Sequence, residues 1–340
     1  MSIQPERIPL NSQEPGQNDN RADAAPLEAS ASQEAWPHPP AASAEDGPQA
    51  PTPLPEPILF AAWDQPEILP QSRVPNFGNL LVFLAALTFV GGTCMFLVTR
   101  TALHFGLFGV TSFTAATKEI HYMLGSECVL YLSTLAACLL LFPLIWHKSF
   151  LAGIQWNGDT ALRLRKSLGM AAAACFVFAI INGLLMKEPV NAPIDQVIRE
   201  RGAAWLMFGF GITLAPIFEE IAFRGFLLPS LCTAWDWTVE RMTGRPPRPL
   251  GSNGHPNWSV GAMIAGSIFT SVPFALIHAE QIAGAVGPLL LLVCVSLVLC
   301  AVRLSTRSVA ASVVVHACYN FLLFSLMLLG TGGFQHMDRM

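Results

Sequence analysis

Long apolar runs separated by short polar segments occupy the chain from residue 77 onward. Each run holds at least 18 residues, enough for an α-helix to cross about 30 Å of hydrocarbon. The seven runs are 77–99, 121–146, 167–186, 203–231, 258–282, 285–302 and 308–329. The stretch 101–118 is apolar but interrupted by Gly and Thr, and is compatible with an eighth short or re-entrant helix. The pattern predicts an all-α fold, a polytopic membrane helical bundle with about seven or eight transmembrane helices.

Composition supports this prediction. Hydrophobic residues make up 52% of the 340-residue chain and charged residues only 12%, with a mean hydropathy of +0.47. An ordinary soluble domain has roughly 25% charged residues. The eight cysteines fall almost entirely within the apolar runs and show no CxxC spacing, which is typical of packing residues rather than of a metal or redox site. We therefore expect the lipid bilayer to be the main partner and expect no nucleic-acid partner.

The first 70 residues differ from the rest. They carry eleven acidic residues against Arg7 and Arg21, a net charge of −9, in a context rich in Pro, Ala and Ser. Such a segment buries too little apolar surface to offset the chain entropy lost on folding. We predict a disordered acidic tail over 1–70. We find no signal-peptide pattern at its start, so the first spanning helix is expected to direct membrane insertion.

Basic residues in the connecting segments suggest an orientation. With seven spans and the N-terminus inside, nine basic residues fall on the cytoplasmic side and six on the other. The nine are Lys148, Arg163, Arg165, Lys166, Arg241, Arg245, Arg248, Arg303 and Arg307. We expect a multi-pass integral protein of a bacterial plasma membrane with its N-terminus in the cytoplasm.

Three charged residues interrupt the apolar run 203–231. Each ionisable group at the centre of a spanning helix costs roughly 2.5 to 3.5 kcal/mol, so Glu219, Glu220 and Arg224 require a reason. Glu220 and Arg224 stand four residues apart on one helix face and can form an ion pair. Glu219 lies about 100° around the helix and lacks that partner. We therefore predict that Glu219 is a general base acting on water.

Two later runs carry pairs of candidate site residues at the same four-residue spacing. Phe274 and His278 lie on one, and His316 and Asn320 on the other. His278 is suited to orient a water molecule or pass a proton, and Phe274 to form a cavity wall. His316 and Asn320 would converge on one spot as donors for a developing carbonyl oxyanion.

These motifs, EExxxR at Glu219–Arg224, FxxxH at Phe274–His278 and HxxxN at His316–Asn320, resemble the CPBP (Abi) family of intramembrane endopeptidases, which includes the type II CaaX prenyl proteases. The resemblance covers roughly residues 200–325. It implies a helical bundle around a membrane cavity in which Glu219 and His278 activate water, His316 and Asn320 stabilise the oxyanion, and Glu220 and Arg224 support the site. The substrate would be a membrane-associated protein or a lipidated peptide.

The resemblance divides the chain into four parts. After the tail, N-terminal transmembrane helices occupy 71–202, a catalytic membrane core 203–329 and a short C-terminal tail 330–340. Within the core, Glu219 lies near the middle of its run, whereas His278 lies some twenty residues along 258–282. For both to reach one water molecule, the helices must tilt, or the run 258–282 must start later or break at Pro273.

Alternatives remain open at this stage. Zinc is possible, because the family has been described both as metalloproteases and as glutamate proteases. The ligands would be Glu219, Glu220, His278 and His316. The guanidinium of Arg224 and the amide of Asn320 suit metal-free catalysis better, so we expect no cofactor. The HExxH, GxSG and GxGD strings of other intramembrane proteases are absent from the sequence. A proton-coupled transporter and a catalytically silent scaffold or immunity protein are the competing functions. The sequence indicates no oligomeric state.

Overall fold

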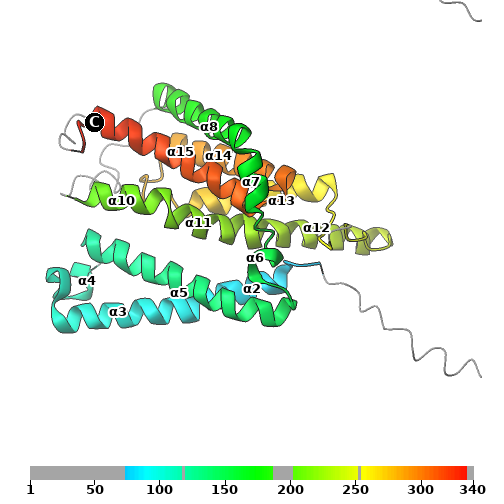
Figure 1. Ribbon diagram of the computed structural model, residues 1–340, viewed down its shortest axis with the longest axis horizontal. Coiled ribbons are helices and arrows are strands. Elements are labelled where there is room, and N and C mark those ends of the chain that lie inside the picture. The colour runs from blue at the N-terminus through cyan, green and yellow to red at the C-terminus, as the bar shows by residue number, and fades with distance from the viewer. Residues whose placement is uncertain (1–72, 117–118, 187–201, 252–253, 335–340) are drawn as a thin grey trace, which may run out of the picture. The chain divides into compact units, whose positions relative to one another are not determined.

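The computed structural model describes residues 73–116, 119–186, 202–251 and 254–334. The predicted acidic tail 1–70 and the end of the predicted C-terminal tail lie outside these ranges. All regular elements of the described residues are helical. Their bounds are α2 Phe77–Ala85, η1 Ala86–Gly91, α3 Gly92–Phe105, η2 Leu107–Gly109, α4 Phe113–Ala116, α5 Ile120–Trp146, α6 Phe150–Gly153, α7 Gly158–Arg163, α8 Arg165–Leu185, α10 Ala203–Ile212, α11 Leu214–Glu220, η3 Ile221–Leu227, α12 Leu228–Thr243, α13 Val260–Leu276, α14 Val286–Thr306 and α15 Val309–Gly330 (Figure 1).

Six helical segments of the described chain are long and apolar enough to cross a membrane. They are Phe77–Phe105, Ile120–Trp146, Arg165–Leu185, Ala203–Thr243, Val286–Thr306 and Val309–Gly330. The shorter apolar helix α13 lies within the one remaining predicted run, 258–282. The prediction of a polytopic helical bundle is therefore confirmed. In the described part of the stretch 101–118, residues 101–116, no separate helix is long enough to span: α3 continues to Phe105 and only the short elements η2 and α4 follow. The cytoplasmic position of the N-terminus stays a prediction.

The segment 203–243 is not one uniform helix but the three α-helices α10, α11 and α12, with the π-helix η3 between the last two (Figure 1). Pro216 lacks a backbone N–H and its ring clashes with the carbonyl four residues earlier, which belongs to Ile212. The helix accordingly breaks at Thr213, whose φ and ψ are −124° and −86°. After the short helix α11, the backbone passes through the π-helix η3, a form common at functional sites. Glu219 and Glu220 thus end the short helix between two irregularities.

The C-terminal helices surround this irregular segment. α15 packs against α8, α10, α11 and α14, while α13 packs against α12 and α14. Ser259 and Ser308 cap α13 and α15 by accepting hydrogen bonds from backbone N–H groups. A Cβ added to Gly266 would lie 2.6 Å from Cys232 Sγ, so α13 and α12 approach closely only because this residue has no side chain.

The end of α13 explains how His278 can lie at the same membrane depth as Glu219. The helix begins at Val260 and ends at Leu276, with Pro273 in its last turn. His278 therefore lies just beyond the helix, in the turn that leads to α14, rather than on a spanning helix as predicted. This position lets its ring turn back toward Phe274, as described below.

Candidate active site

The core of the candidate site is an ion pair sealed inside the bundle. Glu220 and Arg224 are both 0% exposed, and Arg224 Nη1 donates to Glu220 Oε1 at 2.9 Å. Arg224 Nη2 also donates to the carbonyl and hydroxyl oxygens of Ser296 on α14, at 3.0 and 2.6 Å. The ring of Phe274 lies 4.5 Å from the guanidinium carbon, within the range of a cation–π contact. The predicted pairing of Glu220 with Arg224 is confirmed, and it joins η3 to α13 and α14.

His316 on α15 connects the two glutamates. Its Nδ1 lies 2.9 Å from Glu220 Oε1, and because a carboxylate accepts, Nδ1–H is the donor when Glu220 is ionised. Its Nε2 lies 3.9 Å from Glu219 Oε2. The first and third motifs therefore meet at one imidazole ring.

Glu219 differs from its neighbour. Its side chain is 13% exposed and its nearest ionic contact is the one with His316. The Oε2 atom is buried and has no hydrogen-bond partner among the residues that the structure describes. Buried polar atoms are nearly always paired, so an exception requires an explanation. Glu220 Oε2 and Arg224 Nε also lack a partner there, so Glu219 differs from Glu220 in being more exposed and in accepting no hydrogen bond at all from the described residues. Its role as a general base stays a prediction.

The second motif joins the cluster through aromatic contacts. The Phe274 ring centroid lies 5.3 Å from that of His278 and 5.9 Å from that of His316. His278 Nδ1 is 2.9 Å from the Phe274 carbonyl oxygen, so Nδ1–H donates and Nε2 is left for other chemistry. Within the described chain no hydrogen bond links His278 to Glu219. Their joint action on one water molecule stays a prediction.

Asn320 has a structural role that the spacing did not predict. Its Nδ2 donates to the carbonyl oxygen of Gly211 at 2.7 Å. Gly211 is close to the C-terminal end of α10, where the last carbonyls lack intrahelical partners. Asn320 thus caps the helix where it breaks before Pro216. Since the amide group has two N–H donors, one remains for another acceptor.

Arg303 was expected in a loop and is instead buried. It lies inside α14 and is 1% exposed. Its Nε donates to the Arg224 carbonyl at 3.2 Å, and its Nη2 donates to Gln155 Oε1 at 2.6 Å. The prediction of a loop position was wrong because the apolar run ends just before Arg303, whereas the helix continues to Thr306. A second buried arginine therefore holds the backbone of the π-helix in place.

Two polar residues of α5 also face this region and were not predicted. Glu127 is the one carboxylate within α5, and it interacts electrostatically with Glu219 and His278. Tyr131 donates a hydrogen bond to Glu127 at 2.7 Å. The sequence signal was available, because an ionisable residue inside an apolar span is by default a functional-site candidate.

The cluster does not resemble a zinc site. No group of three or more His, Cys, Asp or Glu side chains in the described chain is arranged to hold a metal ion. Glu220 Oε1, one of the proposed ligands, already accepts from both Arg224 and His316. A guanidinium at 2.9 Å opposes a divalent cation at the same oxygen. We therefore derive no step through zinc, and metal-free catalysis stays a prediction.

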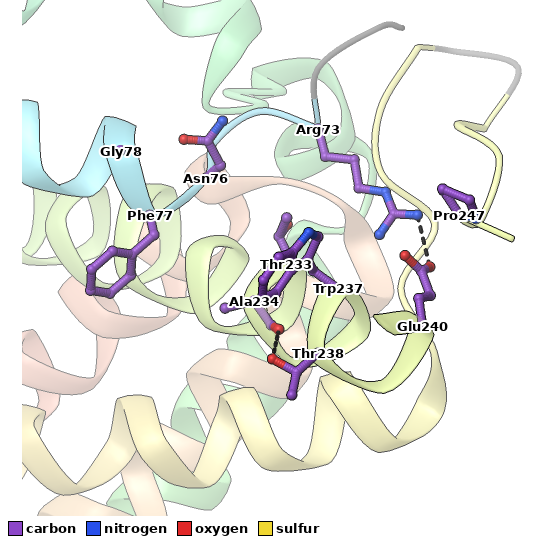
Figure 2. Close-up of a pocket in the computed structure, with 10 residues that line it drawn as sticks. All are labelled: Arg73, Asn76, Phe77, Gly78, Thr233, Ala234, Trp237, Thr238, Glu240 and Pro247. Carbon is purple, nitrogen blue, oxygen red and sulfur yellow. Dashed lines mark hydrogen bonds and ion pairs between the residues drawn. The ribbon is translucent and has the colours of Figure 1, made fainter. Parts of the chain in front are cut away.

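A cavity of about 580 Å³ lies elsewhere, between the start of α2 and the end of α12. Figure 2 shows the ion pair between Arg73 and Glu240 at its rim, with a nitrogen-to-oxygen distance of 2.8 Å. Trp237 and Phe77 supply apolar walls. The lining contains none of the motif residues and no histidine or cysteine, so we assign the chemistry to the cluster around Glu219 and not to this cavity.

Comparison with known protein families agrees with the motifs. The family model described as type II CAAX prenyl endopeptidase Rce1-like matches residues 201–322, just over a third of the chain. This segment contains all three motifs, from Glu219 to Asn320. Comparisons with curated proteins and with solved structures gave no match. The predicted resemblance is thereby confirmed: residues 201–322 are similar to the Rce1-like family of type II CAAX prenyl endopeptidases.

Proposed function

We propose that this chain hydrolyses a peptide bond of a membrane-associated protein or lipidated peptide, with Glu219 as general base. The observation that carries the proposal is Glu219 Oε2, buried, unpaired among the described residues and 3.9 Å from His316 Nε2. Leaving such an oxygen unpaired is costly. Ionisable groups in unusual surroundings collect at catalytic sites, where their chemistry is used.

The distance between Glu219 and His316 suits a shared water molecule. At 3.9 Å the two atoms are too far apart for a direct hydrogen bond. A water oxygen can nevertheless lie about 2.8 Å from each. In the proposed first step, Glu219 takes a proton from this water as its oxygen bonds to the carbonyl carbon of the substrate. His278 assists by receiving that proton at Nε2.

The oxyanion that forms needs donors, and two are available. His316 is held in place by its bond to Glu220, and with a proton on Nε2 it donates toward the reacting carbonyl. Asn320 contributes the N–H that Gly211 does not use. Preorganised donors of this kind contribute more in a site that excludes water. When the C–N bond breaks, His278 passes its proton to the leaving amine, which completes the hydrolysis.

The substrate class follows from the surroundings and from the family. The site lies within helices that cross a bilayer, so its substrate must reach the membrane. The Rce1-like match supports a prenylated peptide with a CaaX terminus as the first probe. We propose cleavage of such a lipidated peptide as the activity to test.

The proposal is tested by comparing new protein termini in membranes of host cells that express the wild-type chain, Glu219→Gln or Glu280→Gln. Glu280 is an exposed carboxylate in the turn after α13, so it provides a matched change outside the site. We expect termini that are present with wild type and Glu280→Gln and missing with Glu219→Gln at equal abundance. Identical termini in all three would refute proteolysis and favour a scaffold or a transporter.

A further inference from the structure

A carboxylate lies inside the apolar helix α5 without a role in the chemistry above. Glu127 is half-buried, and no other Asp or Glu occurs between Ile120 and Trp146. A charged side chain within a spanning helix costs several kcal/mol unless it is paired or lines a polar cavity. A hydrogen bond to Tyr131, one turn away, offsets part of this cost and would by itself make Glu127 a purely structural residue. The position of Tyr131 indicates a link to the candidate site as well.

Tyr131 fixes Glu127 against the helix that carries Glu219. Its ring stacks on that of Phe218, with centroids 3.9 Å apart and planes 5° apart. Phe218 directly precedes Glu219 in α11, and α5 packs against α11 and α10. The Tyr131 hydroxyl donates to Glu127 Oε1 at 2.7 Å. The Glu127 side chain is thus anchored beside the candidate base.

Glu127 also lies within electrostatic range of two site residues that are not hydrogen bonded to each other. It interacts with the Glu219 carboxylate and with the His278 imidazole. Tyr131 interacts with Glu219 as well. A single side chain from α5 therefore interacts with both members of the proposed water-activating pair.

We propose that Glu127 is a positioning residue for the hydrolysis, held by Tyr131, whose carboxylate stabilises the positive charge that His278 acquires during turnover. This inference rests on the proposed function. Because His278 Nδ1–H donates to the Phe274 carbonyl, Nε2 is the atom that takes the proton. A nearby carboxylate favours the resulting imidazolium, strongly so where water is scarce. Glu127 itself exchanges no bond with the substrate.

The test uses the purified full-length protein and a quenched-fluorescence farnesylated CaaX peptide, with kcat, KM and thermal stability measured together. Glu127→Gln keeps an acceptor for Tyr131 but removes the charge. We expect kcat to fall roughly 10- to 100-fold, the range found when the supporting partner of a metal-ligating histidine is lost, with KM and thermal stability unchanged. Ser133→Ala is the matched control on α5, since Ser133 donates only to carbonyls of its own helix, and it should leave both kinetic constants unchanged.

A double substitution tests whether Glu127 acts through His278. In a His278→Ala background, Glu127→Gln should lower the remaining rate by less than about twofold, because coupled residues are not additive. An equal loss in both backgrounds would overturn the inference. If Glu127→Gln does not fold, Tyr131→Phe is measured in its place. This variant keeps the Glu127 charge but loses the hydrogen bond that anchors it. A kcat equal to that of the wild type would also overturn the inference.

The outcomes separate this inference from the proposed function. Full activity of Glu127→Gln together with loss of activity in Glu219→Gln overturns the role of Glu127 and leaves the protease intact. If the wild-type protein and Glu219→Gln cleave the farnesylated and unprenylated probe peptides equally slowly, both the inference and the proposed function are overturned. A fall in thermal stability that accounts for the whole loss of activity in Glu127→Gln assigns Glu127 a structural role only.

Discussion

Replacing Glu219 and Glu220 separately by Gln makes the same chemical change at two adjacent residues with different surroundings. Each substitution removes one negative charge and keeps the shape of the side chain. Glu220 accepts hydrogen bonds from Arg224 and His316, both at 2.9 Å. Glu219 makes one longer contact, at 3.9 Å, with the other nitrogen of His316. We expect Glu220→Gln to destabilise the fold and Glu219→Gln to affect the chemistry alone.

The magnitudes follow from these contacts. Removing one partner of a buried ion pair costs about 3 to 5 kcal/mol, because the other charge is left uncompensated. Arg224 keeps its two bonds to Ser296, which places Glu220→Gln near the lower end, about 3 kcal/mol. Glu219→Gln loses no short bond, so the free energy of unfolding should change by less than about 1 kcal/mol.

Thermal unfolding of the purified protein in detergent measures the difference. At about 2 to 4 °C per kcal/mol for a domain of this size, Glu220→Gln should lower Tm by about 6 to 12 °C. Glu219→Gln should stay within a few degrees of wild type and lose at least about 100-fold in kcat. The opposite pattern, a stable Glu220→Gln and a destabilised Glu219→Gln, would mean that the two roles have been exchanged and that Glu219 is a structural charge.

Three further predictions concern the surroundings of this pair. Asn320→Ala removes the donor to Gly211 and should cost about 1 kcal/mol of stability and about 100-fold in kcat; an unchanged kcat, measured with the peptide probe, would contradict its oxyanion role. Arg303→Lys cannot reproduce the separate bonds to the Arg224 carbonyl and to Gln155, so Tm should fall by several degrees while KM stays the same. A chelator such as phenanthroline should leave kcat within about twofold, because Arg224 occupies the oxygen that zinc would need; loss of activity that added zinc restores would contradict the metal-free prediction.

The spans and the ion pair could be predicted because they depend on local spacing. Hydrocarbon thickness sets the length of an apolar run, and helical geometry places Glu220 beside Arg224. The meeting of His316 with both glutamates depends instead on how α15 packs against α11, which no local spacing encodes. The sequence placed His316 at the site through its family resemblance, but it assigned no bond to Glu220.

Residues with two roles were the hardest to predict. Asn320 stood out as an oxyanion donor, yet its bond to Gly211 requires the helix break that Pro216 causes. Pro216 could be read from the sequence, but the sequence did not show that the break would leave the Gly211 carbonyl free to accept a hydrogen bond from Asn320. Arg303 was misplaced for a related reason, since it stands at the end of an apolar run and its partner Gln155 lies far away in the chain. No role was predicted for Glu127, whose interactions with Glu219 and His278 also span distant parts of the chain.

The difference between these residues bears on whether the chain is a catalyst or a silent scaffold. In lipid, an irregular backbone persists only where its polar groups find partners. Asn320 serves Gly211 at the helix break, and Glu220 and Arg224 neutralise each other, so each of the three has a structural reason to be present. Glu219 accepts no hydrogen bond from the described residues, and its one ionic contact is the 3.9 Å approach to His316. A carboxylate held this loosely in an apolar segment is expected to cost stability. A scaffold would gain stability from an apolar residue at this position, whereas a hydrolase needs the carboxylate, so the presence of Glu219 argues for catalysis.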